Sequence, residues 1–149
     1  MRSLLRACAA ALLLVCGAEP ALCLPVATIS IDTPKGPAQF QMEIAADQKS
    51  QEQGLMYRTK MAPNAGMLFD LHVPQPVAFW MKNTYLPLDI VFVRADGTIS
   101  TVEPNAIPMS TDSIPSAEPV RAVIELNGGR AHDLGIVPGA QVHGSIFGK

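Results

Sequence analysis

Residues 79–93 read Phe79-Trp80-Met81-Lys82-Asn83-Thr84-Tyr85-Leu86-Pro87-Leu88-Asp89-Ile90-Val91-Phe92-Val93. This stretch holds the only tryptophan of the chain and sets a few polar residues into an otherwise apolar run. The pattern of its side chains predicts two strands, 77–84 and 88–93, with a proline break between them. Because neither face of the first strand is uniformly polar, we expect that strand to be covered on both sides.

Residues 94–98 form the turn that follows, because they contain Asp-Gly, a typical hairpin dipeptide. The length of the hairpin loop sets the register of the two strands that it joins. A two-residue loop would place Glu103 beside Ile90. A three-residue loop, with Gly97 in a left-handed conformation, would place Val102 there instead.

We favour the three-residue loop, which pairs Val93 with Ile99, because apolar side chains then meet across the strands. In this register Asp89 and Glu103 lie side by side on one face. Two carboxylates placed in this way repel each other unless a cation or a shared proton intervenes. Lys82 lies on a strand face that reaches them, so we predict a cluster of these three charges.

Short segments typical of β-strands recur along the rest of the chain, at 28–32, 39–44, 66–69, 120–127 and 141–147. Residues 47–53 are the best helix candidate, and 130–134 form at most one helical turn. Residues 104–119 contain four prolines, so we expect no regular element there. These features predict a mainly β protein, a compact antiparallel β-sandwich or barrel-like single domain with one or two very short helices.

The first residues predict a secretory signal peptide. Arg2 and Arg6 precede a short apolar run, residues 7–15, which the small residues Gly17 and Ala18 follow. The apolar run is shorter than the roughly 20 residues that a membrane-spanning helix needs. We therefore predict a signal peptide over 1–18, cleaved after Ala18 or as late as residue 23, and no transmembrane segment in the mature chain.

Export to the periplasm or the medium follows from this signal, with 19–27 as a flexible lead-in and 28–149 as the β-rich domain. The residues before Cys16 and Cys23 are Val and Leu, where a lipid-anchor signal requires a small residue, so lipoprotein anchoring is not expected. Cleavage leaves Cys23 as the only cysteine. A single cysteine excludes an internal disulfide and a cysteine-based metal site.

The charge of the mature chain gives no reason to expect nucleic acid as a partner. Removing Arg2 and Arg6 from the 11 basic residues leaves nine against 13 acidic ones, a net charge of −4. The sequence has no basic run, zinc-finger spacing or Gly-rich phosphate loop, and we expect no cofactor. His72, His132 and His143 lack the spacing of a metal-binding pair. We expect a monomer without bound metal.

Six motifs stand in order along the chain: Gly54-Leu55-Met56-Tyr57-Arg58, Gly66-Met67-Leu68-Phe69, Phe79-Trp80-Met81-Lys82-Asn83-Thr84, Pro87-Leu88-Asp89, Val102-Glu103-Pro104-Asn105 and Glu125-Leu126-Asn127-Gly128-Gly129. Together they resemble the bacterial and archaeal domain of unknown function 192 family. The resemblance covers about residues 29–147, and 79–84 is its most specific part. It implies a single sandwich-like β-rich domain, often behind a signal peptide, and no established activity.

Lys82, Asn83 and Thr84 are the strongest site candidates. With Trp80 as a stacking wall, they would form the polar floor of a pocket for a small molecule. The structural alternative is that Lys82 pairs with a carboxylate while its two neighbours satisfy turn backbone groups. Arg58 has two comparable interpretations, as an anion clamp or as the partner of one of the candidate carboxylates.

Three carboxylates could perform acid/base chemistry on a glycosidic bond if two of them had separated pKa values. Three functions therefore stay open: a ligand-binding module, which we favour, a small hydrolase that uses these carboxylates, and an accessory protein that binds another protein through residues 104–119. The catalytic candidates are Asp89, Glu103 and Glu125. The ligand-binding candidates are Arg58, Trp80, Lys82, Asn83, Thr84, Asp89, Glu103 and Glu125.

Overall fold

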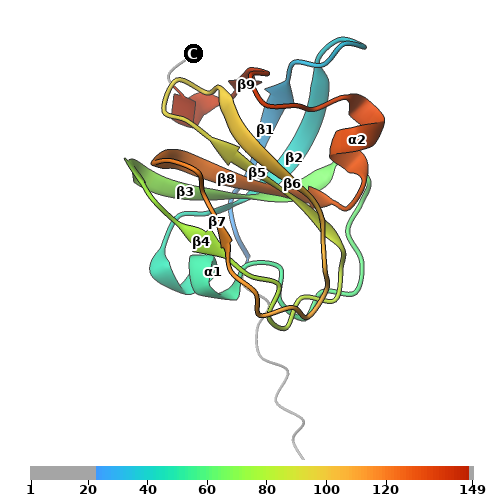
Figure 1. Cartoon of the computed structure of the whole chain (residues 1–149), viewed down its shortest axis with the longest axis vertical. Coiled ribbons are helices and arrows are strands. Elements are labelled where there is room, and N and C mark those ends of the chain that lie inside the picture. The colour runs from blue at the N-terminus through green and yellow to red at the C-terminus, as the bar shows by residue number, and fades with distance from the viewer. Residues whose placement is uncertain (1–22, 148–149) are drawn as a thin grey trace, which may run out of the picture.

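A computed structural model describes residues 23–147 of the chain (Figure 1). Its elements are β1 (Val26–Ile31), β2 (Ala38–Ala45), α1 (Gln48–Gln53), β3 (Ala65–Gln75), β4 (Ala78–Phe79), β5 (Leu88–Val93), β6 (Ile99–Ala106), β7 (Ile114–Pro115), β8 (Val120–Asn127), α2 (Arg130–Leu134), β9 (Val142–His143) and the 3-10 turn η1 (Ser145–Phe147). The predicted signal peptide and its cleavage sites before residue 23 lie outside the described residues.

One curled sheet carries most of these strands, in the order β6-β5-β8-β3-β2-β1-β9, and β4 and β7 form a separate two-stranded ribbon. The two ends of the sheet approach each other at one side. There the amide of Ile99 donates to the carbonyl of Ala140 at 2.9 Å, and the amide of Val142 donates to the carbonyl of Gly97 at 2.8 Å. The result is a half-barrel, which confirms the predicted mainly β, barrel-like single domain.

Strands β2 and β3 run parallel, with Gln41 beside Ala65, whereas the other strand pairs of the described residues are antiparallel. A parallel pair requires a crossover connection, and α1 lies within that connection. The crossover places α1 on one side of the sheet. Figure 1 shows α1, β4 and β7 on that side, with α2 and β9 on the other.

Both faces of the sheet are therefore covered, which explains why every residue of β5 is buried. Val91 and Val93 point into the core beneath α2 and β9. Leu88, Ile90 and Phe92 point into a second core beneath α1 and the β4–β7 ribbon. Each such side chain contributes about 1.5–3 kcal/mol on burial, so both layers stabilise the sheet.

The helix predicted over 47–53 is confirmed as α1. The side chain of Asp47 accepts a hydrogen bond from the amide of Ser50 at 3.0 Å, and Ser50 completes a capping box. Gly54 ends the helix with a φ of +48°, which explains why glycine stands there.

Other predicted boundaries are wrong. The strand expected over 77–84 shrinks to the two residues of β4, because Asn83 has a φ of +57° and lies in a turn. Residues 104–119 were expected to be irregular, yet β6 continues to Ala106 and β7 lies within the same segment. Strand β1 begins at Val26, within the predicted lead-in.

The hairpin loop is confirmed in part. Gly97 is left-handed, with a φ of +84°, and Val93 pairs with Ile99 as the three-residue loop requires. Ser100 is then an extra residue on β6, because Phe92 pairs with Thr101 rather than with Ser100. This bulge shifts the rest of the hairpin by one residue.

The shift makes one predicted neighbour wrong. Ile90 pairs with Glu103 rather than with Val102. Directly opposed residues share a face of the sheet, so Glu103 lies on the face of Ile90. Asp89 is on the other face, because successive side chains of a strand alternate. Asp89 and Glu103 are therefore separated by the sheet.

Candidate ligand-binding site

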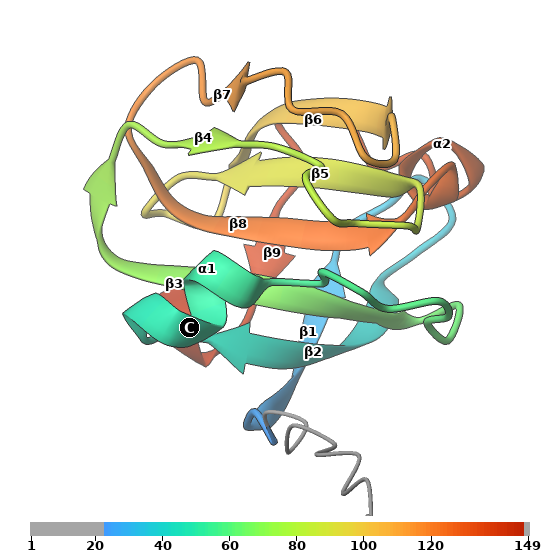
Figure 2. The ribbon, with the colours of Figure 1, turned by 90° about the horizontal axis from the view of Figure 1, so that it is seen from below.

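A cavity of about 430 Å³ lies on the face of the sheet that α1 and β4 cover, between these two elements. Its size falls in the range of about 300–1,000 Å³ that small-molecule sites occupy. In Figure 2, α1 lies in front of β3, and β4 lies near β5. The cavity is lined by Gln48, Gln51, Glu52, Gln53, Gly54, Leu55, Met56, Phe69, Leu71, Val77, Ala78, Phe79, Trp80, Thr84 and Glu125.

Glu125 is the buried acid of this cavity. It lies on β8 between the buried residues Met67 of β3 and Ile90 of β5, and only 5% of it is exposed. Its Oε2 atom has no hydrogen-bond partner within residues 23–147. Burial raises the pKa of Glu125 to about 8, against a smaller opposite effect of the charge on Arg58. The side chain is therefore mostly a neutral acid at pH 7.

Aromatic rings form one wall and the mouth of the cavity. Phe69 and Phe79 pack edge to face, with ring centroids 4.9 Å apart. Trp80 is half exposed, and Lys82 Nζ lies 5.1 Å from the centroid of its ring. A cation at this distance over an indole is held by a cation–π interaction.

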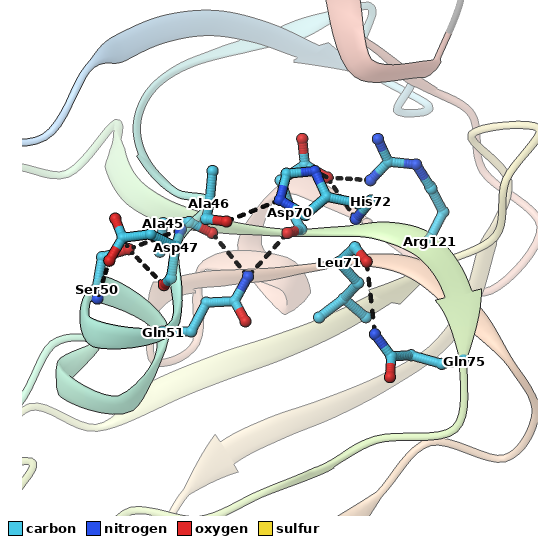
Figure 3. Close-up of polar contacts among 10 residues, drawn as sticks. All are labelled: Ala45, Ala46, Asp47, Ser50, Gln51, Asp70, Leu71, His72, Gln75 and Arg121. Atoms are coloured by element: carbon cyan, nitrogen blue, oxygen red, sulfur yellow. Dashed lines mark hydrogen bonds and ion pairs between the residues drawn. The ribbon is translucent and has the colours of Figure 1, made fainter.

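The α1 wall is anchored to β3 by polar contacts (Figure 3). The side-chain amide of Gln51 donates to the carbonyl of Asp70 at 2.8 Å and to that of Ala45 at 3.3 Å. The Asp70 carboxylate accepts from the guanidinium of Arg121 and from the amide of His72. Burial acts to raise the pKa of Asp70, but these hydrogen bonds outweigh it and hold the pKa below its ordinary value. The residue of β3 that α1 contacts is thus itself held by an ion pair with β8.

Arg58 is a structural residue beside the cavity. Its guanidinium donates to both carboxylate oxygens of Glu43, at 2.5 and 2.6 Å. These hydrogen bonds raise the pKa of Arg58 above its ordinary value. Arg58 lines an adjoining hollow that shares Gly54 and Met56 with the cavity. Arg58 does pair with a carboxylate, but the prediction that its partner is Asp89, Glu103 or Glu125 is wrong, because the partner is Glu43.

Asn83 and Thr84 mainly form hydrogen bonds that stabilise the turn after β4 and its contact with Tyr57. The Asn83 side chain donates to Tyr57 Oη at 2.9 Å, and its carbonyl accepts from the Tyr57 amide at 2.8 Å. Thr84 is buried and donates to the carbonyl of Lys82 at 3.3 Å, yet it also lines the cavity. Of the predicted ligand-binding residues, Trp80, Thr84 and Glu125 thus meet at one cavity.

Asp89 is a structural residue on the opposite face of the sheet, where its carboxylate binds backbone amides. Its Oδ1 atom accepts from the amides of Asn105 and Gly129 at 2.8 and 3.0 Å, and Oδ2 accepts from the amide of Ala131 at 2.7 Å. The carboxylate joins β5 to the end of β6 and the start of α2. The predicted cluster of Asp89 with Lys82 and Glu103 is therefore wrong.

The same geometry separates Asp89 from the other two catalytic candidates. Asp89 lies opposite Leu126 and shares its face of the sheet. Glu125, the residue before Leu126 on β8, points to the other face. Glu103 is exposed and lies in a different hollow, beside β7. A glycosidase needs two carboxyl groups on one cleft, and Asp89 is removed from any such pair by its position.

Residues 29–144 match the family model of DUF192, described as an uncharacterized ACR. The chain belongs to the DUF192 family. This result confirms the resemblance that its motifs carry. No curated protein matches the chain.

Two crystal structures resemble this DUF192 protein over most of its length. One is a candidate transcription regulator from Sinorhizobium meliloti 1021, with 46% identity and a TM-score of 0.80, and the match covers 83% of this chain and 96% of that chain. The other is a protein of unknown function from Novosphingobium aromaticivorans DSM 12444, with 37% identity and a TM-score of 0.81, and it covers 86% and 91%. Neither description assigns a ligand.

The α1 side of the cavity in this DUF192 protein was missed by sequence reasoning. Its glutamines, Gln48, Gln51 and Gln53, are unremarkable in a short polar helix, and only the crossover between β2 and β3 brings them to Glu125.

Within residues 23–147, no helix is long and apolar enough to cross a membrane, and no three His, Cys, Asp or Glu side chains are grouped to hold a metal ion.

Proposed function

We propose that this DUF192 protein is a small-molecule-binding module whose ligand occupies the cavity in front of Glu125. One observation carries the proposal: a buried carboxyl group without a hydrogen-bond partner for Oε2 lies in the lining of an open, mainly apolar cavity. A buried polar group left unsatisfied costs about 1–3 kcal/mol. A ligand that hydrogen-bonds Glu125 would remove this cost.

The surrounding residues suit such a role. Trp80 and Thr84 reach the same cavity, so a ligand would stack on the indole while its polar group meets Glu125. Lys82 holds the indole from outside, and Arg58 supports the loop between α1 and β3 through Glu43. In this scheme Trp80, Thr84 and Glu125 bind the ligand, and Lys82, Asn83 and Arg58 position them.

We further propose that the protein binds its ligand after export, as a periplasmic or secreted monomer. The basic start and short apolar run of the signal peptide support this location. The description of the Sinorhizobium protein suggests DNA as another partner. The formal charge of −2 and the lack of a basic run in this sequence do not favour that partner.

Trp80 makes the proposal easy to test, because it is the only tryptophan and lines the cavity. A set of small aromatic and aliphatic probes would be titrated against the mature chain while its fluorescence is followed. Ala78 is exposed on β4 and lines the same cavity, so Ala78→Phe should fill it and Ala78→Ser should leave it open. We expect a probe to change the fluorescence of the wild type and Ala78→Ser, but not of Ala78→Phe. Equal responses in all three would contradict the proposed site.

A further inference from the structure

The ionisable side chains that line the cavity are both acidic. Among its lining residues, Glu52 and Glu125 are acidic and none is Lys, Arg or His. Arg58 contributes a positive potential at Glu125, but both of its outer nitrogens are engaged by Glu43. Complementarity of charge therefore favours a cationic or neutral ligand over an anion.

The aromatic wall distinguishes these two options. Phe69, Phe79 and Trp80 line the cavity, and aromatic rings attract cations through their negative π-faces. Lys82 already lies over the Trp80 ring, and its side chain is exposed. The indole therefore already holds one cation, so the ligand cation is expected at Glu125 rather than over Trp80.

We propose that the ligand of this cavity is a small organic cation, whose ammonium or amidinium group pairs with Glu125 while its apolar body lies against Phe79 and Trp80. The inference rests on the proposed function, because it names the chemical class of the ligand that the cavity would bind. A buried carboxylate and a ligand cation would satisfy each other, as buried charges in proteins do when paired and hydrogen-bonded.

Binding would be coupled to the loss of a proton. Glu125 is mostly protonated in the free protein at pH 7, and it would ionise when the cation arrives, releasing its proton to solvent. Other charged groups on this side of the sheet include Arg58 after α1, Glu52 on α1, Lys82 over Trp80, Glu43 on β2 and Glu103 on β6. Met67 and Ile90, the strand neighbours of Glu125, do not titrate.

The expected pH dependence follows from this coupling. With a pKa of about 8 for Glu125, the ionised fraction rises about ninefold from pH 6 to pH 7. The affinity for a permanently charged ligand should rise by the same factor. A neutral ligand that hydrogen-bonds the protonated acid should show no such rise.

The test uses benzylammonium, with benzyl alcohol as the neutral probe of similar size and phenylacetate as the anion. Each is titrated at pH 6, 7 and 8 with the fluorescence of Trp80 as the signal. We expect benzylammonium to bind most tightly and about ninefold more tightly at pH 7 than at pH 6. Calorimetry in buffers of different ionisation enthalpy should show about 0.9 proton released per ligand at pH 7.

Glu125→Gln keeps the shape of the side chain and removes its charge. It should weaken benzylammonium at least tenfold at pH 8, weaken benzyl alcohol much less, and abolish proton release. The exposed Glu52→Gln serves as the matched control and should retain proton release. Equal binding of benzylammonium by wild type and Glu125→Gln would overturn the inference. So would tighter binding of benzyl alcohol at every pH, which would still leave the proposed function in place. No response to any of the three probes would contradict both.

Discussion

Glu125 should make the protein less stable as pH rises, and Glu125→Gln should remove this effect. The pKa of the group is raised to about 8 by burial in the folded chain, against an ordinary value of 4.5 that applies when the chain is unfolded. The folded state therefore holds a proton that the unfolded state releases between these two values. The stability that this proton supports is fully present below pH 4.5 and is lost as pH rises through 8.

The size of the effect follows from the same two values. Each unit of pKa difference corresponds to about 1.4 kcal/mol. Between pH 5 and pH 7 the unfolded group ionises almost completely, whereas the folded group stays mostly neutral. The contribution of Glu125 to the free energy of unfolding should thus fall by about 2–3 kcal/mol over this range.

Urea denaturation of the mature chain, followed by Trp80 fluorescence at pH 5, 6, 7 and 8, measures this quantity. The difference between Glu125→Gln and the wild type isolates Glu125, because the other titrating groups are common to both proteins. We expect Glu125→Gln to gain about 2–3 kcal/mol relative to the wild type from pH 5 to pH 7. Glu52→Gln on α1 should show no such gain. A constant difference between Glu125→Gln and the wild type across the range would refute the assignment of Glu125 as a neutral acid.

Three further substitutions test the frame around the cavity. Asp89→Ala leaves three backbone amides, one buried and two partly buried, without their acceptor. It should lower the free energy of unfolding by about 3 kcal/mol or more in urea denaturation. Glu103→Gln, at an exposed site, is the control and should stay within about 0.5 kcal/mol. Gly97→Ala places a methyl group 2.6 Å from a carbonyl oxygen of β9, at a residue whose φ is positive. This change should lower the thermal midpoint by several degrees, equivalent to about 1–3 kcal/mol. An unchanged midpoint would contradict the close approach. Arg121→Met leaves the buried Asp70 without its charged partner and should lower the free energy of unfolding by about 3–5 kcal/mol. Amide hydrogen exchange in α1 should become faster. Exchange at the wild-type rate would show that this ion pair does not anchor the helix.

The fold class could be predicted because it depends on local signals. The apolar run of β5 and the Asp-Gly turn after it define a hairpin without any knowledge of distant residues. The capping box of α1 is equally local, since Asp47 and Ser50 are three residues apart. These elements were placed correctly for the physical reasons that the sequence suggested.

The register beyond the hairpin turn depends on distant contacts and could not be predicted. Ile99 exchanges hydrogen bonds with Gly139 and Ala140, near the other end of the sheet order, and the bulge at Ser100 follows directly. The preference for apolar cross-strand pairs was too weak to outweigh this closure. As a result Glu103 was placed on the face of Asp89 instead of the face of Ile90.

The candidate site was predicted in part for the same reason. A carboxylate inside an apolar strand has to be satisfied, and the sequence marked Asp89 in this way but named Glu125 only as a candidate carboxylate. Only the tertiary structure shows that three amides satisfy Asp89, whereas Glu125 Oε2 has no partner within the described residues. The α1 wall depends on a parallel crossover that no local signal marks.

The titration of the Glu125 side-chain carboxyl carbon by NMR, with and without benzylammonium, tests the binding site most directly. Comparison with Glu125→Gln assigns the resonance. We predict a pKa of about 8 for the free protein and a clearly lower value with the cation bound. A pKa near 4.5 that benzylammonium does not change would contradict both the neutral buried acid and the ligand site built around it.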